Sequence, residues 1–308
     1  MTTLVVPNPP NIWQLNSLLA DDESIVTWIG TDGSRWPLAG GLVPMPGVQP
    51  GVVLQSVAGL MGAFKHLDQQ GARQDGVTYE DTVWDATEID LGINISAQTP
   101  REFRLVFHRW LDSWDTRTRG RMMWYSRQFG EWWVDLRAMK LPANVIKTAP
   151  AAMTTLDLNW VARADFPFWC SFDSTSQLVA SNATTLVDPS GANPAGWLPL
   201  WNRGDQDGWP RHLVQGPGTF TFGDGVSSNT VVFGPVPAGV QVLITTLPRI
   251  RSINEVNTGE NLYHLLTGRF TVPIPRGAAV HIPCSVTGAA AGVTRVISSL
   301  TPYRRWPE

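Results

Sequence analysis

The stretch that decides the fold class lies within residues 204–254. Its three apolar runs are Thr219-Phe220-Thr221-Phe222, Thr230-Val231-Val232-Phe233 and Gln241-Val242-Leu243-Ile244-Thr245-Thr246. A turn at Gly223-Asp224-Gly225 separates the first two runs, and a second Gly/Pro turn separates the last two. Three short apolar runs separated by glycine, proline and aspartate are typical of antiparallel strands. No set of residues in this stretch could perform chemistry. The stretch therefore predicts an all-β module that packs or binds.

The composition predicts sizeable cores and surfaces that are partly covered. Apolar residues make up 43% of the 308 residues, while charged residues make up only 16%, well under the usual quarter. A surface with so little charge points to subunit contacts. The net charge of −3 gives no reason to expect a nucleic-acid-binding surface. The 15 tryptophans fit both a β-sandwich core and interface anchors, where tryptophan is enriched.

The first half of the chain also reads mainly as strands and turns. Residues 25–38 predict a hairpin around Asp32-Gly33, one of the stronger short-range signals that a sequence offers. Residues 87–95 alternate polar and apolar side chains with period two, which predicts a strand with one buried face. Residues 101–107 alternate more loosely. Residues 58–72 contain three glycines and predict a mobile loop.

One helix is predicted over residues 112–125. Asp112 or Ser113 can serve as its N-cap, and Asp115 would lie in the first turn, where the helix dipole favours negative charge. Tryptophans and arginines recur around it at three- and four-residue spacings, which places them on one helical face. They are Trp110, Trp114, Arg117 and Arg121.

The fold predicted from these patterns is mostly β, with two domains. Residues 1–170 would form the first domain, with an N-terminal arm and the single helix, and residues 193–308 the second. Residues 171–192 are rich in small polar residues and predict the boundary between them. Cys170 and Cys284 are far apart in the sequence; two buried free thiols are favoured, and one disulfide remains an alternative. We expect no signal peptide and no membrane span.

The motifs of catalytic, cofactor and metal sites are missing from the sequence, and we expect neither an enzyme nor a bound cofactor or metal. The pair His66 and Asp68 reads as solvated, and residues 205–208 read as a turn rather than a calcium loop. One enzymatic alternative is a glycan hydrolase, which needs two carboxylates about 5–9 Å apart in a cleft. Its candidates are Glu80, Asp81, Asp85, Glu88 and Asp90, beside Trp84.

A basic cluster in the first half is interleaved with aromatic side chains. Its arginines are Arg117, Arg119, Arg121 and Arg127, and its aromatic residues are Trp114, Trp124, Tyr125 and Phe129. Arginine beside aromatic residues can stack on nucleic acid. The net acidity of the chain and the helical spacing favour a protein–protein face instead, where both residue types are enriched.

The ordered set of these pieces resembles the distal tail protein family of siphophages, as found among the minor tail proteins of actinobacteriophages. In the first half the resemblance rests on the hairpin at 25–38, the run Gly51-Val52-Val53-Leu54-Gln55-Ser56-Val57-Ala58-Gly59-Leu60, Gln74-Asp75-Gly76, the strand at 87–95, and Arg101-Glu102-Phe103. In the second half it rests on Asn202-Arg203-Gly204-Asp205, Trp209-Pro210, Gly216-Pro217 and the three strands quoted above. It covers about residues 24–300.

The resemblance implies a structural virion protein at the distal end of the phage tail, assembled in the host cytoplasm. The first domain would form a ring-forming β-sandwich and the second a galectin-like β-sandwich. The implied assembly is a homo-hexameric ring that joins the tail-tube protein to the tail-tip hub protein, with the tape-measure protein and other minor tail proteins as further partners. No membrane is involved, and DNA only passes through the lumen.

Residue type and position give candidates for two binding roles. The interface candidates are the 58–71 loop and Trp36, Trp110, Trp114, Arg117, Arg121 and Trp124. The alternative function is a carbohydrate-binding adhesin that recognises the host surface. For that role the candidate glycan-binding residues are Trp201 and Trp209.

Overall fold

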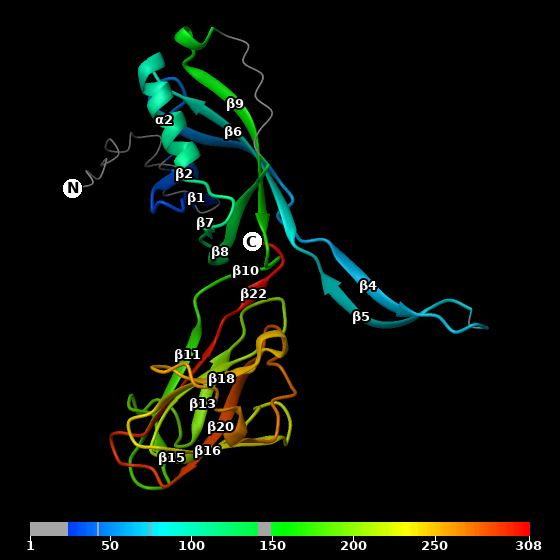
Figure 1. Cartoon of the computed structure of the whole chain (residues 1–308), viewed down its shortest axis with the longest axis vertical. Helices are drawn as coiled ribbons and strands as arrows, with labels where there is room; N and C mark the ends of the chain where they lie inside the picture. Colours follow the sequence, from blue (N-terminus) through cyan, green and yellow to red (C-terminus); the bar gives the residue numbers. More distant parts are fainter. Residues whose placement is uncertain (1–23, 42, 74, 141–148) are drawn as a thin grey trace. The chain divides into compact units, whose positions relative to one another are not determined.

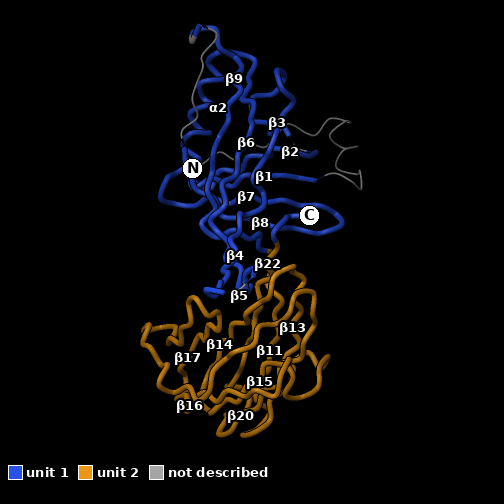
Figure 2. Tube along the Cα trace, turned by 90° about the vertical axis from the view of Figure 1, so that its right-hand side faces the viewer, with its two compact units in different colours: residues 1–170, 305–308 blue, residues 171–304 orange. Residues whose placement is uncertain are grey.

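The computed structural model describes residues 24–41, 43–73, 75–140 and 149–308 (Figure 1). The chain divides into two compact units (Figure 2). Unit 1 comprises residues 1–170 and 305–308, and unit 2 comprises residues 171–304. The described residues are mostly in strands, with one α-helix, which confirms the predicted mostly-β fold. The expected boundary segment, 171–192, contains β11 (Ser174–Ala180) and β12 (Leu186–Val187).

Unit 1 is built on an antiparallel sheet with the strand order β2-β1-β7-β8-β9-β6-β3. Its strands are β1 (Ile25–Ile29), β2 (Arg35–Ala39), β3 (Gly51–Ala58), β6 (Thr87–Ser96), β7 (Gly120–Ser126), β8 (Gly130–Lys140) and β9 (Thr155–Ala164). The short β10 (Trp169–Cys170) pairs with β8, and a 3-10 turn covers Pro150–Ala152. The period-two pattern at 87–95 becomes β6, whose apolar positions are buried as predicted.

The helix lies earlier in the chain than predicted. Helix α2 spans Pro100–Asp112, and the last part of the predicted helix, residues 120–125, lies in β7 (Gly120–Ser126). The start of α2 is a capping box, in which the Thr99 hydroxyl accepts from the Glu102 amide and the Glu102 carboxylate accepts from the Thr99 amide. Pro100 at the first helical position adds a fixed φ. These signals outweigh the Asp112 and Ser113 cap that sequence reasoning favoured, and Ser113 instead ends the helix.

Tryptophan side chains form much of the core of unit 1, between α2 and the sheet. Trp28 on β1 stacks on Trp114 with ring centroids 3.8 Å apart, and its indole N–H donates to the Ser113 hydroxyl. Trp110 and Trp160 are 0% and 1% exposed and meet edge to face. Of the two explanations for the high tryptophan content, the core therefore accounts for a large part.

The segment predicted as a mobile loop forms a hairpin instead. Strand β4 (Phe64–Gln69) pairs antiparallel with β5 (Thr78–Trp84), and these two strands make a sheet of their own. In Figure 1 the hairpin extends away from the large sheet. Its base is fixed where Trp84 meets Phe168 edge to face, with centroids 5.4 Å apart.

Unit 2 consists of two antiparallel sheets that share one core. One sheet has the order β12-β11-β21-β14-β17-β18, and the other β13-β20-β15-β16-β19. The strands not yet given are β13 (Trp197–Trp201), β14 (Arg211–Gln215), β15 (Gly218–Gly223), β16 (Thr230–Val236), β17 (Gln241–Thr245), β18 (Ser252–Glu255), β19 (Leu266–Thr267), β20 (Ala279–Thr287), β21 (Arg295–Leu300) and β22 (Tyr303–Arg304), with 3-10 turns at Pro248–Ile250 and Tyr263–Leu265.

The stretch that decided the fold class supplies strands to both sheets of unit 2. Strands β15 and β16 form a hairpin in one sheet, and β17 crosses to the other, where it pairs with β14. Phe220 and Phe233 from the first sheet and Val242 from the second are all 0% exposed. The core between the sheets is therefore made by this one stretch to a considerable extent.

Cys170 lies on β10 and Cys284 is buried in unit 2, and no disulfide joins them. Burial raises the pKa of the Cys284 thiol, because a thiolate is poorly solvated among apolar side chains. The favoured prediction that no disulfide forms is confirmed, but the expectation that both thiols are buried is wrong for Cys170, which is only half-buried. No helix in the described part of the chain is long and apolar enough to cross a bilayer.

Candidate interaction surface

Two arginines face each other on the outer side of the unit 1 sheet. Arg137 on β8 is the register partner of Arg163 on β9. Both alternate with residues that point into the core, since their neighbours Leu136 and Ala162 are fully buried. Like charges directly opposite each other on a sheet are destabilising. The pair therefore needs a counter-charge to be stable.

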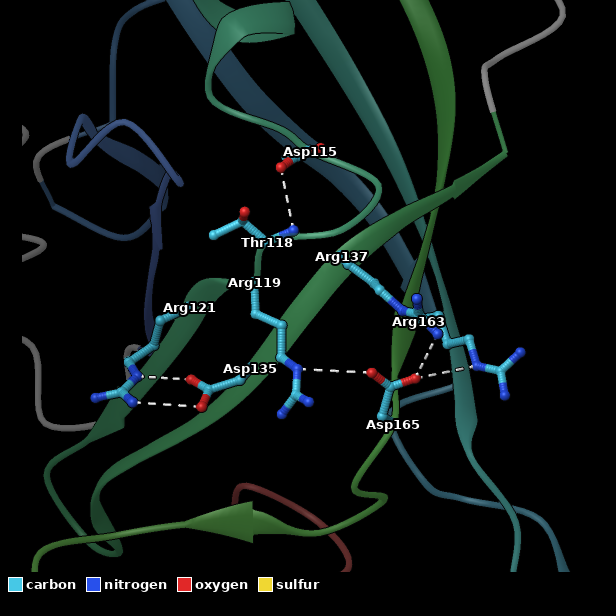
Figure 3. Close-up of polar contacts among 8 residues, drawn as sticks. All are labelled: Asp115, Thr118, Arg119, Arg121, Asp135, Arg137, Arg163 and Asp165. Carbon is cyan, nitrogen blue, oxygen red and sulfur yellow. Dashed lines mark hydrogen bonds and ion pairs between the residues drawn. The ribbon is translucent and has the colours of Figure 1, made fainter.

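Asp165, directly after β9, supplies that counter-charge for three arginines at once (Figure 3). Its Oδ1 lies 2.8 Å from Arg137 Nη2 and 3.4 Å from Arg163 Nε. Its Oδ2 lies 3.6 Å from Nε of Arg119, the residue before β7. Among the described residues, the only other acidic side chain in register with these arginines is Glu88 on β6, the partner of Arg163 on its other side, and two carboxylates cannot neutralise three guanidinium groups. This arginine cluster, defined as Arg119, Arg137 and Arg163 around Asp165, keeps an excess of positive charge.

The arginine cluster is accessible from solvent. The side chains of Arg119, Arg137 and Arg163 are 54%, 35% and 42% exposed. A guanidinium group presents five N–H donors, so contact with one carboxylate oxygen leaves most of them available to a second acceptor. An anionic group from a partner can therefore reach the cluster without any change in the fold of unit 1.

Arg121 extends this basic surface along β7. Its Nε and Nη2 contact the two carboxylate oxygens of Asp135, at 2.8 and 3.4 Å. Its guanidinium carbon also lies 5.0 Å from the centre of the Trp133 ring. The side chain is thus held by a two-point ion pair and a cation–π contact, which fixes the direction of its charge.

The loop between α2 and β7 is shaped by Asp115. Its carboxylate accepts from the amides of Arg117 and Thr118, at 3.2 and 3.1 Å, and its carbonyl accepts from the Ala138 amide on β8. Hydrogen bonds from the Thr118 side chain and amide, and then from the Arg117 amide, lower the pKa of the Asp115 carboxyl to about 2. The ionised carboxylate closes the turn that leads directly to Arg119.

Three predicted interface tryptophans lie in the core. Trp110 is 0% exposed, Trp114 8% and Trp36 9%, and Trp36 meets Trp110 edge to face at 5.5 Å. Side chains packed in this way stabilise unit 1 and cannot anchor a partner at its surface. The helical spacing that suggested a common outer face for Trp110 and Trp114 fails because α2 ends between them.

The other interface candidates lie at the surface of unit 1. Arg117 and Arg121 are exposed. Trp124 is half-buried; it meets Trp169 edge to face at 6.1 Å, and its indole N–H donates to the Glu308 carboxylate at 2.7 Å. The structure brings Arg121 close to the arginine cluster, as Figure 3 shows. A role of these three residues in assembly stays a prediction.

The glycan-binding candidates occupy different positions in unit 2. Trp201 is 56% exposed at the end of β13, whereas Trp209 is half-buried in the segment before β14. Sequence reasoning missed Trp197, which is 41% exposed and lies four residues before Trp201 on the same face of β13. The His281 ring meets Trp197 edge to face at 6.5 Å.

The carboxylates of the hydrolase alternative lie spread over exposed strands. Glu80 and Asp81 are on β5, Glu88 and Asp90 are outward positions of β6, and Asp85 pairs with Lys65 at 2.8 Å. A cavity of about 390 Å³ beside β3, β6 and β9 is lined by no carboxylate of the described residues.

These positions remove the support for a hydrolase. In the described ranges no group of three histidine, cysteine or acidic side chains is placed to hold a metal. His66, considered with Asp68 in the sequence, contacts the Thr82 hydroxyl on the neighbouring strand.

The comparisons with known proteins give matches among solved structures only. No protein-family model matches the chain, and no curated protein does. The crystal structure of Dit from phage SPP1, described as a paradigm of the hub adsorption apparatus in phages that infect Gram-positive bacteria, aligns with a TM-score of 0.58 at 10% identity. The alignment covers 91% of this chain and 99% of that one.

Two structures of the phage p2 baseplate in its activated conformation also align. With Ca the TM-score is 0.50 and with Sr it is 0.52, each at 9% identity over 92% of this chain and 99% of that chain. The chain has the fold of these phage hub and baseplate proteins. At such low identity the likeness concerns the fold and not particular residues, so the contacts described above must be interpreted on their own chemistry.

Sequence reasoning found Arg119 but missed the rest of the arginine cluster. Arg137 and Arg163 were available as outward positions of two alternating strands, and Asp165 as the residue just beyond the second. What the sequence could not provide was the pairing of β8 with β9, which places residues 26 positions apart side by side.

Proposed function

We propose that this chain is a structural protein of a phage virion, a distal tail protein that forms a hexameric ring between the tail tube and the tail-tip hub and lets DNA pass through its lumen. The observation that carries the proposal is the shared fold with SPP1 Dit over 91% of this chain and 99% of that one, which includes both units. A match over nearly all of both chains favours a common architecture rather than a shared domain in unrelated proteins.

The partners follow from this position in a siphophage tail. They are other copies of the chain, the tail-tube protein, the tail-tip hub protein, and, for minor contacts, the tape-measure protein and other minor tail proteins. Unit 1 forms the ring, and unit 2, as a galectin-like sandwich, carries other tip components. The surface of unit 1 supports this division, since its arginine cluster leaves positive charge for a partner.

The direct test is the mass of the purified protein in solution, followed by electron microscopy of the particles. We expect a closed ring of six copies and, in virions, antibody labelling at the distal tail end. Arg117→Ala and Arg121→Ala together should weaken the ring, because both side chains are exposed on unit 1. Arg249→Ala, an exposed position in unit 2, is the matched control. Labelling along the tube or on the capsid would contradict the proposal.

A second candidate function is a carbohydrate-binding adhesin, favoured by the two exposed tryptophans on one face of β13. Trp197 and Trp201 present flat apolar rings at an edge strand, as a sugar-stacking platform requires. A glycan array tests this function. Trp201→Ala should abolish binding, and Trp209→Ala tests the second candidate residue in the same assay. Absence of binding by a chain that assembles normally would rule it out.

A further inference from the structure

The cavity of about 390 Å³ in unit 1 has no part in the function proposed above. It lies on the outer face of the sheet, beside the loop that precedes β3 and the ends of β6 and β9. Ligand pockets in proteins have volumes of roughly 300–1,000 Å³. The cavity is therefore large enough to hold a small molecule, and its wall decides which kind.

The wall of the cavity is neutral. No charged side chain of the described residues lines it. Its polar groups are the amides and hydroxyls of Gln55, Asn94, Ser96 and Thr155, and its apolar groups include Pro46 and Val53. A charged ligand would lose its hydration here without gaining a counter-charge in the wall. The lining thus favours an uncharged ligand that carries both polar and apolar groups.

Two amide side chains in this wall are oriented by Asp157 on β9, the register partner of Asn94. Its Oδ1 accepts from Asn94 Nδ2 at 2.7 Å and from Gln55 Nε2 at 3.3 Å. An ionised carboxylate only accepts hydrogen bonds, so the NH₂ group of each amide must be the one that faces Asp157. The carbonyl oxygens of both amides are then left for other partners.

The carbonyl oxygen of Asn94 has no such partner in the described part of the chain, although the atom is buried. The other end of this amide is fully used, because Nδ2 also donates to the Thr155 hydroxyl at 3.0 Å. Buried polar groups of native proteins nearly always have a hydrogen-bond partner. An unpaired acceptor in the wall of a cavity therefore indicates that the occupant of the cavity supplies the donor.

The same wall also offers donors. The Ser96 hydroxyl accepts from the Gly47 amide at 3.4 Å, and the Thr155 hydroxyl accepts from Asn94. Each hydroxyl keeps its own hydrogen, which it can donate. An ammonium or guanidinium group only donates and would match the amide oxygens alone. A ligand hydroxyl both donates and accepts, and it can match the amide oxygens and the hydroxyls together.

We propose that this cavity binds a neutral saccharide. Hydroxyl groups of a sugar ring donate to the carbonyl oxygens of Asn94 and Gln55, and the C–H groups of the ring lie against Val53. The site belongs to unit 1, whereas the two exposed tryptophans of β13 belong to unit 2. The inference goes beyond the proposed function and does not depend on it, because it requires neither a ring nor a tail protein.

The test is saturation-transfer difference NMR on the full-length chain with D-glucose, D-galactose, N-acetyl-D-glucosamine and L-rhamnose, each titrated alone. We expect at least one of these sugars to bind. Asn94→Ala and Gln55→Ala each remove one acceptor and should weaken that binding by about three- to tenfold. Val53→Trp places a large ring in the cavity and should abolish it.

Controls separate binding from folding. Asn159→Ala changes an exposed asparagine on β9, two residues beyond Asp157 and outside the lining, and should bind like the original chain. Gln55 is exposed, so Gln55→Ala keeps the inference testable if Asn94→Ala lowers the stability of unit 1. Circular dichroism checks the fold of each variant.

The outcomes are distinct. Binding that is lost with Val53→Trp and kept with Asn159→Ala supports the site. Failure of all four sugars to bind up to their solubility limits would overturn it, as would binding of free L-arginine in preference to every sugar. Binding that survives Val53→Trp and is lost with Trp201→Ala would place the sugar on β13 and overturn the cavity as its site. Ring formation by the purified chain is measured separately, so a failure here leaves the distal tail function standing.

Discussion

Two hairpins of this protein share a local design and differ in everything that surrounds them. The β15–β16 hairpin of unit 2 and the β4–β5 hairpin of unit 1 each have a glycine with positive φ in the connecting turn, Gly225 at 74° and Gly76 at 81°. In the first, Phe220 and Phe222 are 0% exposed. In the second, Phe64 is 52% exposed. The same strand and turn chemistry thus produces one covered and one open hairpin.

The difference arises from neighbours that are distant in the sequence. Strand β15 pairs with β20 on its other edge, and β16 pairs with β19. The apolar face of this hairpin then packs against the second sheet of unit 2. The β4–β5 sheet has no third strand among the described residues. A covered hairpin is a stability element, whereas an open one is available to a partner, and each of the following predictions tests that distinction.

The largest effect is expected from shortening a phenylalanine in each hairpin. Phe220→Ala removes a ring from the closed core of unit 2 and should lower the free energy of unfolding by about 3–5 kcal/mol. Phe64→Ala removes a half-exposed ring that contacts Trp84 and should cost less than about 1 kcal/mol. Urea unfolding of both variants measures the difference. Equal losses would show that the open hairpin is already covered within the monomer.

The next effect is the acid sensitivity that the covered hairpin confers on unit 2. The buried ring of His212 stacks on Phe222 at 4.7 Å, and its Nδ1 lies 2.7 Å from the Ser298 hydroxyl. Burial lowers the pKa of His212 from 6.5 to about 3. The unfolded chain therefore takes up a proton below about pH 6.5 that the folded chain refuses. Above about pH 6.5 this proton uptake has no effect on the free energy of unfolding. Between about pH 6.5 and pH 3 it lowers the free energy of unfolding by about 1.4 kcal/mol for each pH unit.

The variant His212→Leu isolates this contribution. Because the variant loses the contact with Ser298, it should be less stable than the original chain at neutral pH. Its stability should fall less steeply between pH 6 and 4, because the group that takes up the proton in the unfolded chain is gone. Urea midpoints at several pH values provide the two slopes. Parallel slopes would mean that His212 does not stay neutral in the folded core.

A smaller effect is expected from removing one aspartate in each hairpin, Asp224 in the turn of the first and Asp81 within β5 of the second. Asp224, 7% exposed, accepts from the Val226 and Ser227 amides at 2.9 and 2.6 Å and from the Ser227 hydroxyl. Asp224→Ala leaves these donors unpaired and should cost about 1–2 kcal/mol. Asp81→Ala in the open hairpin removes one contact to an adjacent amide and should cost less than about 0.5 kcal/mol. Thermal unfolding of the two variants measures both losses. A larger loss for Asp81→Ala than for Asp224→Ala would contradict the distinction between the covered and the open hairpin.

The smallest effect is expected from the ion pair of the open hairpin. Lys65 and Asp85 are 2.8 Å apart, and their side chains are 73% and 43% exposed. Solvent screens such a pair, so Lys65→Met should change the stability of the monomer by no more than about 0.5 kcal/mol, and by less as the salt concentration rises. A loss above about 1.5 kcal/mol, measured by urea unfolding, would show that the pair is shielded from water.

The sequence was sufficient for features that depend on neighbouring residues. The alternation in 87–95, the Asp-Gly turn at 32–33 and the apolar runs of 219–246 predicted β6, the β1–β2 hairpin and β15 to β17. The helix was misplaced although its capping box at Thr99 and Glu102 is a local signal. That error came from weighing arginine and tryptophan spacing above the cap, not from missing information.

What only the tertiary structure decided is which side chains are covered. Residues 204–254 by themselves determine strands with an apolar face, because alternation and turn chemistry act over a few residues. The crossing of β17 to the opposite sheet, the burial of Trp110 and Trp114, and the meeting of Arg137 with Arg163 depend on strand pairing over long separations. Burial is a property of the neighbours that folding brings together, and a single strand carries no record of them.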